Sequence, residues 1–254
     1  MNTRWILAIS VALLGATLAV VPAVRADQLW LRQGTSGYSG CTDTWLDEDG
    51  QTENNGNATL IQVYDVSDDP DESGLIRFNL PGLFPTGPIE INYATLSLRL
   101  DERRLITGDE FCEIGAYRVM PTRDWAELQA TWLVFKGTSY WGTPGCESSA
   151  DRNLTPDDTV VFTATSSEGL MYSWDVTSSV TQWVENSVGN AGWLLRVTSS
   201  TSGGNEGCNF DSSEALIEGA RPSLLIDYDV VPEPATVGLV GVGLALLLRQ
   251  RKRR

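Results

Sequence analysis

The chain is 254 residues long, with 33 Asp and Glu against 18 Lys and Arg and with no histidine. Without an imidazole it cannot build a Ser-His-Asp or Cys-His nucleophilic system, so an enzyme would depend on carboxylate, Tyr, Lys or Arg side chains. The excess of acidic groups repels phosphates and argues against binding to nucleic acid.

The first 26 residues predict a secretory signal peptide. Arg4 supplies the basic start, residues 5–21 form an apolar body, and Val24 to Ala26 give a small-residue cleavage site. An uncleaved membrane anchor is the alternative, but Pro22 and Ala26 suit cleavage. We therefore expect export. Between residues 27 and 248, eleven Lys and Arg stand against 33 Asp and Glu, a net charge of −22. This part is long enough for one domain with one core.

The exported body reads as short strands separated by turn residues. The clearest is 89–100, where apolar and polar side chains alternate. After Asp175, the expected N-cap, apolar residues recur at helical spacing up to Val184. Together these patterns predict an all-β, jelly-roll-like antiparallel β-sandwich with one short helix. The other expected strands are 28–32, 43–48, 58–63, 74–80, 113–119, 159–165, 170–175, 193–197 and 223–228, with a turn or short helix at 121–132 and a loop at 133–156.

The body contains four cysteines. An even number in an oxidising compartment predicts two disulfides, for which three pairings are possible. We expect Cys112–Cys146 and Cys41–Cys208. The absence of histidine and of a C-x-x-C spacing argues against a zinc site.

Two loops are rich in carboxylates and are candidate Ca²⁺ ligands in an exported protein. The first is not an EF-hand loop, because Gly50 comes too early in it. Solvated acidic loops are the alternative reading of both. The candidate ligands are Asp47 and Asp49 in the first loop, and Asp68, Asp69 and Asp71 in the second.

Several side chains are candidates for sugar binding, because an aromatic ring can stack on the apolar face of a sugar. Tyr140 and Trp141 lie in a loop of Gly, Thr and Pro near Lys136, which predicts an exposed platform. A loop that is packed down against the body is the alternative. Arg103 and Arg104 are candidates for hydrogen bonds to sugar hydroxyls, or for pairing with carboxylates. We expect five other tryptophans to be structural: Trp125, Trp132, Trp174, Trp183 and Trp193.

The C-terminal residues 231–254 predict a processed signal. Val231, Pro232, Glu233 and Pro234 precede an apolar run at 235–248 and a basic tail at 249–254. As a transmembrane helix the run would span about 21 Å, less than a hydrocarbon core of about 30 Å, and the basic tail would stay in the cytoplasm. This order resembles the PEP-CTERM sorting signal of Gram-negative bacteria, which implies recognition by the membrane enzyme exosortase. A permanent membrane anchor is the alternative.

The body itself resembles the DNRLRE domain from about residue 43 to residue 229. The resemblance implies an extracellular β-sandwich that accompanies polysaccharide-active enzymes and surface proteins, with alginate-binding carbohydrate modules among its relatives. The chain departs from the pattern in cysteine-containing insertions and in lacking an attached catalytic domain. The segments that carry the resemblance are 74–80, 94–100, 117–119, 125–132, 174–183, 192–196, 210–214 and 221–224.

These features predict three segments: a signal peptide at 1–26, a sandwich domain at 27–230 and a sorting signal at 231–254. We expect a non-catalytic protein of the cell envelope, cell surface or extracellular matrix that binds or organises extracellular polysaccharide. A hydrolase or lyase that uses carboxylate, Tyr or Arg groups is one alternative. A purely structural envelope protein is the other.

Overall fold

The computed structural model describes residues 26–66, 71–186, 188–201 and 205–231. The expected signal peptide, the apolar run 235–248 and the basic tail lie outside these ranges. Among the described residues, no helix has both the length and the apolar character needed to cross a bilayer. The strands are β1 Ala26–Arg32, β2 Cys41–Asp47, β3 Leu60–Val66, β4 Glu72–Phe78, β5 Ile89–Arg104, β6 Phe111–Arg118, β7 Val134–Lys136, β8 Ser139–Tyr140, β9 Asp158–Thr163, β10 Met171–Asp175, β11 Trp193–Ser200, β12 Asn205–Asp211 and β13 Ser223–Val230.

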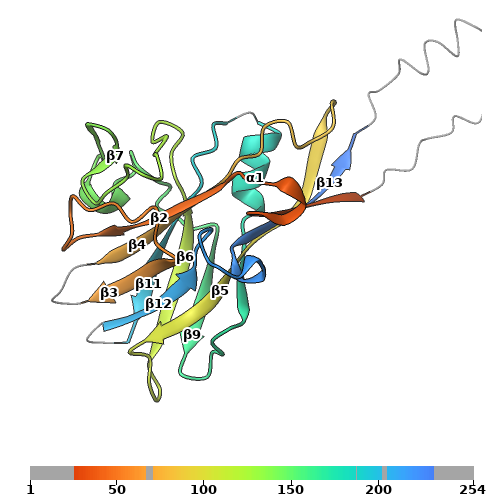
Figure 1. Ribbon diagram of the computed structural model, residues 1–254. Helices are drawn as coiled ribbons and strands as arrows, with labels where there is room; N and C mark the ends of the chain where they lie inside the picture. The colour runs from red at the N-terminus through yellow and green to blue at the C-terminus, as the bar shows by residue number, and fades with distance from the viewer. Residues whose placement is uncertain (1–25, 67–70, 187, 202–204, 232–254) are drawn as a thin grey trace, which may run out of the picture. The chain divides into compact units, whose positions relative to one another are not determined.

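One antiparallel sheet of eleven strands curls over to make both layers of the described body (Figure 1). Strand β5 connects the two layers: its first half pairs with β13 and β10, and its second half pairs with β12. Between these halves the pairing of β12 moves from Leu100 to Glu102, so Asp101 is an extra residue. Such a bulge bends a strand and increases its twist, which lets one strand serve both layers. The sandwich expected from the sequence is therefore confirmed.

The first layer has the order β1–β13–β5–β10, with β1 as an edge strand. Ala26 pairs with Asp229 and Arg32 with Ser223, so the first and last strands of the described body lie side by side. The second layer contains β9, β6, β11, β4 and β2, and β12 and β3 continue from β5 into it.

The inner core lies between the layers and is rich in aromatic rings. Trp174 packs against Phe162 and Phe210, with ring centroids 6.3 and 5.8 Å away. Trp183 of helix α1 (Thr177–Val184) meets Trp193 of β11 at 4.6 Å. The indole N–H of Trp174 donates to the Ile114 carbonyl at 2.8 Å and that of Trp193 to Asp157 at 3.0 Å, whereas the buried indole N–H of Trp183 has no hydrogen-bond partner among the described residues. These contacts confirm a structural role for all three tryptophans.

A second cluster of buried side chains covers the outer side of the second layer. Leu75 and Leu194 point outward there and are buried under the segment 119–146. That segment contributes Trp125, Trp132 and Trp141 to the cluster. The first layer has no such cover in the described body, since Trp30 and Tyr93 on its outer side are 50% and 40% exposed.

Several local expectations need correction. Helix α1 begins at Thr177 with Val176 at the N-cap position. Asp175 still accepts a hydrogen bond from the Thr177 N–H, at 3.0 Å, but lies one residue earlier than expected. The segment 121–132 forms turns, and the expected loop 133–156 contains the β7–β8 hairpin. The sequence pattern does not predict strand β12, because its first three residues are Asn205, Glu206 and Gly207.

The expected disulfides are wrong for this structure, in which all four thiols are free and buried. Cys146 belongs to the outer cluster and Cys112 to the inner core, so the second layer separates them. Cys41 opens β2 opposite Phe78, whereas Cys208 lies on β12 opposite Val63. Burial raises the pKa of the Cys112 thiol to about 12 and raises the pKa of the other three thiols as well.

Candidate functional site

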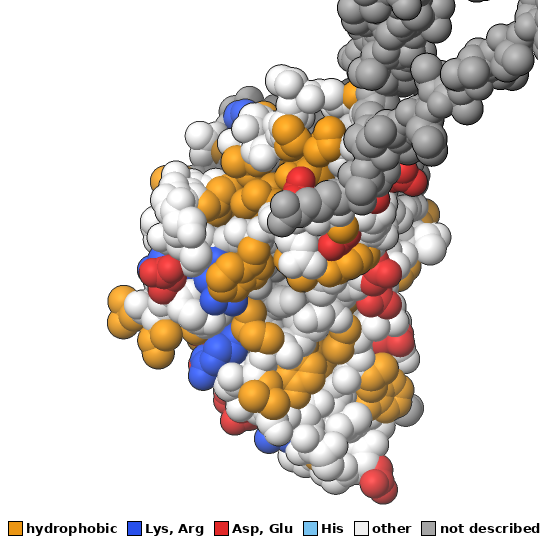
Figure 2. Space-filling view, turned by 90° about the vertical axis from the view of Figure 1, so that its right-hand side faces the viewer, with side chains coloured by type: hydrophobic (Ala, Val, Ile, Leu, Met, Phe, Trp, Pro, Cys, Tyr) orange, Lys and Arg blue, Asp and Glu red, His pale blue; other side chains and the backbone are white. Residues whose placement is uncertain are grey.

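The outer side of the first layer presents a surface that we call the open face. Its side chains belong to alternate residues of four neighbouring strands, because the residues between them point into the core. Figure 2, which looks at the side on which β13 lies, shows uncharged polar and hydrophobic side chains over the middle of that side. The basic groups lie toward the left-hand edge of this view, and most of the acidic groups lie toward the right-hand edge. The open face comprises Gln28, Trp30 and Arg32 of β1, Ser223, Leu225 and Asp227 of β13, Tyr93, Thr95, Ser97 and Arg99 of β5, and Met171, Ser173 and Asp175 of β10.

The two exposed aromatic residues of the open face lie on strands that are not neighbours. Trp30 is in register with Leu225, and Leu225 with Thr95, while Tyr93 lies two residues from Thr95 along β5. With about 4.8 Å between strands and about 3.4 Å per residue, the Cα atoms of Trp30 and Tyr93 are about 12 Å apart. Hydroxyls of Ser97 and Ser173, themselves 2.8 Å apart, add polar groups beside them. The face therefore combines aromatic rings with hydrogen-bonding side chains.

A hydrogen-bond network holds one aromatic residue of the open face in place. The Gln28 side-chain amide donates to the Tyr93 hydroxyl at 3.0 Å and to an Asp227 carboxylate oxygen at 3.1 Å. Asn92 donates to the other Asp227 oxygen at 2.8 Å. Because these bonds join side chains of β1, β13 and β5, the polar row across the three strands is ordered before any ligand arrives.

The two arginines of the open face have partners of their own. Arg32 stacks on Trp30, with 4.6 Å between the guanidinium carbon and the ring centroid. Burial lowers the pKa of Arg32, and the nearby Glu218 opposes this shift. Arg99 pairs with Asp211 at 2.6 Å. One of the two positive charges on this surface, Arg99, is therefore ion-paired, and the other, Arg32, lies against the Trp30 ring.

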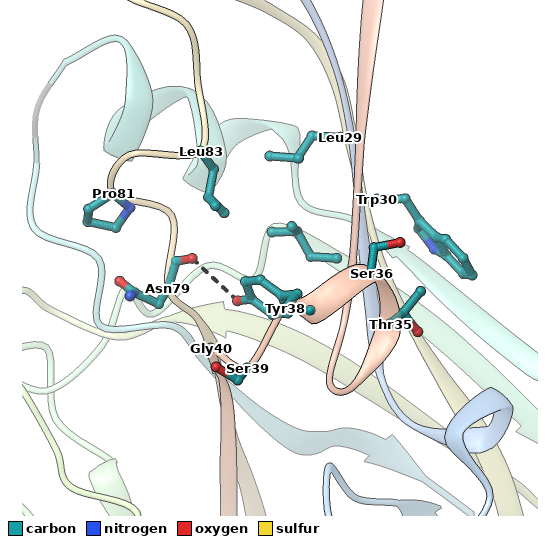
Figure 3. A pocket seen from close by; sticks show the side chains of 12 residues that line it. Leu29, Trp30, Thr35, Ser36, Tyr38, Ser39, Gly40, Asn79, Pro81 and Leu83 are labelled. Carbon is teal, nitrogen blue, oxygen red and sulfur yellow. Dashed lines mark hydrogen bonds between the residues drawn. The ribbon is translucent and has the colours of Figure 1, made fainter.

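A cleft, which we call the edge cleft, lies on the side of β1 opposite the open face. It has a volume of about 390 Å³ and is lined by residues 29–31, 35–40, 79, 81 and 83. Figure 3 shows that Tyr38 directs its hydroxyl to the Asn79 carbonyl, at 3.3 Å, while Trp30 points away from the cleft. Leu29 and Leu83 lie above the Tyr38 ring in this view. Burial raises the pKa of the Tyr38 phenol.

The structure does not assemble the expected sugar platform of Tyr140 and Trp141. Tyr140 is 67% exposed, but Trp141 is only 4% exposed and donates its indole N–H to the Thr131 carbonyl at 2.9 Å. The expectation of an exposed Trp141 is wrong, because its ring completes the outer cluster. Lys136 is paired with Asp124 at 3.0 Å.

The expected arginines lie elsewhere and are already engaged. Arg103 donates to the Ala164 carbonyl and lies 3.4 Å from Glu168. Arg104 pairs with Glu72 at 2.5 Å and stacks on Tyr64. Figure 1 shows the β7–β8 hairpin and the far end of β5, which carries both arginines, at different ends of the body. One sugar site cannot join the two groups.

The two loops of expected calcium ligands lie side by side, since the Glu48 N–H donates to the Asp71 carbonyl at 3.1 Å, but their carboxylates have other partners. An Asp47 oxygen accepts the backbone N–H of Asp49 at 2.9 Å, and Asp71 lies 3.9 Å from Arg196. Asp68 and Asp69 lie outside the described residues. Within the described ranges, no group of three or more His, Cys, Asp or Glu side chains is arranged to hold a metal ion.

A buried group of carboxyls lies under β2. Asp43, 2% exposed, accepts the Ser213 N–H at 2.8 Å, and its own N–H donates to Glu127 at 2.9 Å. Burial raises the pKa of Asp43 well above its usual value, and repulsion from Glu214 adds to the shift. These groups are in neither the open face nor the edge cleft. Their hydrogen bonds connect β2 to two distant turns, which is a structural role.

Two family models match the chain. The model described as carbohydrate-binding module family 96 matches residues 35–228, and the one described as PEP-CTERM protein-sorting motif matches residues 230–254. Among curated proteins, none matches the chain. The second match confirms the sorting signal and with it exosortase-dependent export. The first covers most of the sandwich and confirms carbohydrate binding, so the chain belongs to carbohydrate-binding module family 96.

Proposed function

We propose that this exported protein binds neutral polysaccharide across its open face and does not cleave it. The observation that carries the proposal is the pair of exposed rings, Trp30 and Tyr93, on a sheet surface whose other side chains are mostly uncharged. Sugar rings offer apolar C–H faces for stacking and hydroxyl edges for hydrogen bonds. The rings and the Ser, Thr and Gln side chains of the open face match both.

Charge supports a neutral ligand. Residues 27–248 carry a net charge of −22, and of the two arginines of the open face Arg99 is paired with Asp211 while Arg32 is stacked on Trp30. A polymer of uronic acids would find the single unpaired guanidinium of Arg32 on the open face, and repulsion from the acidic body around it would oppose binding.

The state of the carboxyl groups supports binding without turnover. Glycoside hydrolysis by the common route needs two carboxyls on either side of the bond that is cleaved. On the open face, Asp227 accepts hydrogen bonds from Gln28 and Asn92, and Asp175 accepts them from Thr177. The carboxyl with the strongly raised pKa, Asp43, is buried elsewhere.

We also propose the organisation of the whole chain. Residues 1–26 direct export and are removed, residues 27–230 are the binding domain, and the run 235–248 holds the chain in the membrane until exosortase processes it. The product then serves in the cell envelope or extracellular matrix, where its ligand is produced.

The test is a binding panel of neutral polymers (hydroxyethylcellulose, glycogen, mannan, xylan) and acidic polymers (alginate, polygalacturonate), with and without Ca²⁺, followed by a reducing-end assay. We expect binding to a neutral polymer, no requirement for Ca²⁺ and no release of product. New reducing ends would indicate a hydrolase or lyase, and preference for an acidic polymer would refute the argument from charge. Failure to bind any polymer would favour a structural envelope protein.

A further inference from the structure

We infer that the edge cleft is a second sugar subsite, which holds one unit of a bound polysaccharide where the chain passes over β1. The inference rests on the proposed function and extends it, because it assigns to the ligand a contact outside the open face. It also assigns a role to the segment 29–40, which the sequence analysis did not connect with binding.

The chemistry of the edge cleft suits a pyranose unit. Leu29, Leu31 and Leu83 provide apolar walls. The Asn79 carboxamide and the hydroxyls of Ser36 and Ser39 make no side-chain hydrogen bond within the described part of the chain, so they are available to a ligand. The volume of about 390 Å³ falls within the range of about 300–1,000 Å³ that is typical of small-molecule sites.

The walls of the cleft are ordered without a ligand. The Tyr38 ring stacks on Phe78, with centroids 6.3 Å apart and planes inclined by 17°. Gly40 is required there, because a Cβ at this position would lie 2.9 Å from both the Asn79 Cβ and the Tyr38 hydroxyl. Ser36 adopts a left-handed backbone, with φ 51°. Such a conformation persists in a non-glycine residue only when its surroundings enforce it, and it is found more often at ligand sites.

The place of β1 connects the cleft to the open face. Leu29 and Leu31 line the cleft, and Trp30 between them points away from it (Figure 3) and belongs to the open face. Because β1 is the edge strand, a polysaccharide that crosses the open face passes over β1 last and reaches the cleft beyond it. Residues 29–31 precede the family match at 35–228.

The test compares two matched asparagine variants. Asn79→Ala removes a carboxamide at the cleft, and Asn57→Ala removes another exposed one, also without a side-chain hydrogen bond, from the loop before β3, which does not line the cleft. Calorimetry uses length series of cello-, malto-, manno- and xylo-oligosaccharides. We expect Asn79→Ala to weaken binding of the longer oligosaccharides about five- to tenfold, the effect of one or two lost hydrogen bonds, and to reduce the gain in affinity with length. Asn57→Ala should match the parent protein.

A second variant, Ser39→Trp, places a large ring at the mouth of the cleft and should remove the same gain in affinity. If both cleft variants bind like Asn57→Ala while Trp30→Ala is weakened, the cleft is not a subsite and the open face remains the site. If the parent protein binds neither the oligosaccharides nor any polymer, the proposed function fails, and the cleft inference fails with it.

Discussion

Replacing Trp30 by alanine is expected to weaken polysaccharide binding about tenfold. Trp30 is 50% exposed. Of a side-chain surface of about 250 Å², roughly half is therefore free, and a sugar laid on one side of the ring covers roughly half of that, about 60 Å². At about 25 cal/mol per Å², the substitution removes about 1.5 kcal/mol of binding free energy, a factor of about ten in Kd.

The assay is affinity electrophoresis in gels that contain the polymer bound best by the parent protein. Tyr140→Ala is the matched control, because Tyr140 is also an exposed aromatic residue on a strand but lies on the β7–β8 hairpin. The substitution at Trp30 should leave the fold intact, since the contact it removes is the stacking with Arg32, worth about 0.5–1 kcal/mol at an exposed site. A melting curve checks this.

One result would refute the reasoning: weaker binding by Tyr140→Ala together with unchanged binding by Trp30→Ala. The polysaccharide would then lie against the side of the body that carries the hairpin.

The remaining predictions concern stability and thiol chemistry. The pKa of Asp43 is raised above its usual 3.8, so its contribution to stability is full below that pH and is lost as the pH rises. Asp43→Asn should therefore reduce the fall in the free energy of unfolding between pH 4 and 9, measured in urea. An equal fall in the variant and the parent would contradict the buried proton. Asp151 accepts hydrogen bonds from the N–H groups of Gly142 and Thr143 and pairs with Arg123, so Asp151→Ala should cost about 3–5 kcal/mol in the free energy of unfolding. The pKa of Asp151 is lowered, because hydrogen bonds outweigh burial; its contribution should be lost as the pH falls below 3.8, and equal unfolding of the variant and the parent at pH 7 would contradict this role. Trp193→Ala should cost about 3–5 kcal/mol, measured in urea, and a loss below about 1 kcal/mol would place its ring outside the core. All four thiols should resist iodoacetamide in the native protein and all should react in urea without a reductant, as counted by mass spectrometry; fewer than four labels in urea would reveal a disulfide.

Much of the fold could be predicted because alternation is a strong signal in strands with one buried side. In β5, Ala94, Leu96 and Leu98 point to the core and the residues between them point outward, as the period of two requires. Strand β12 lacks that contrast. Its glycine, Cys208 and Asn209 are all buried, because β12 pairs with both β3 and β5.

The candidate site was harder to predict, because its members come from four strands. Trp30 lies between Leu29 and Leu31, so its parity alone indicated an outward ring, and Tyr93 holds the corresponding position beside Ala94. What the sequence did not indicate is which strands are neighbours, since β1 pairs with β13 at the other end of the chain. The position of Trp141 could not be predicted from its neighbours. Its Gly- and Pro-rich surroundings indicate an exposed loop, but its ring is buried in the outer cluster.

The pairing of Ala26 with Asp229 has a practical consequence. The domain can be attached to a surface, a fluorescent protein or a second module through either terminus, and in both cases the attachment point is the same pole. The antiparallel strands β1 and β13 then extend side by side away from the support. A protein immobilised in this way keeps the open face accessible to long polymers, so it can be used in single-molecule pulling experiments without redesign of the chain.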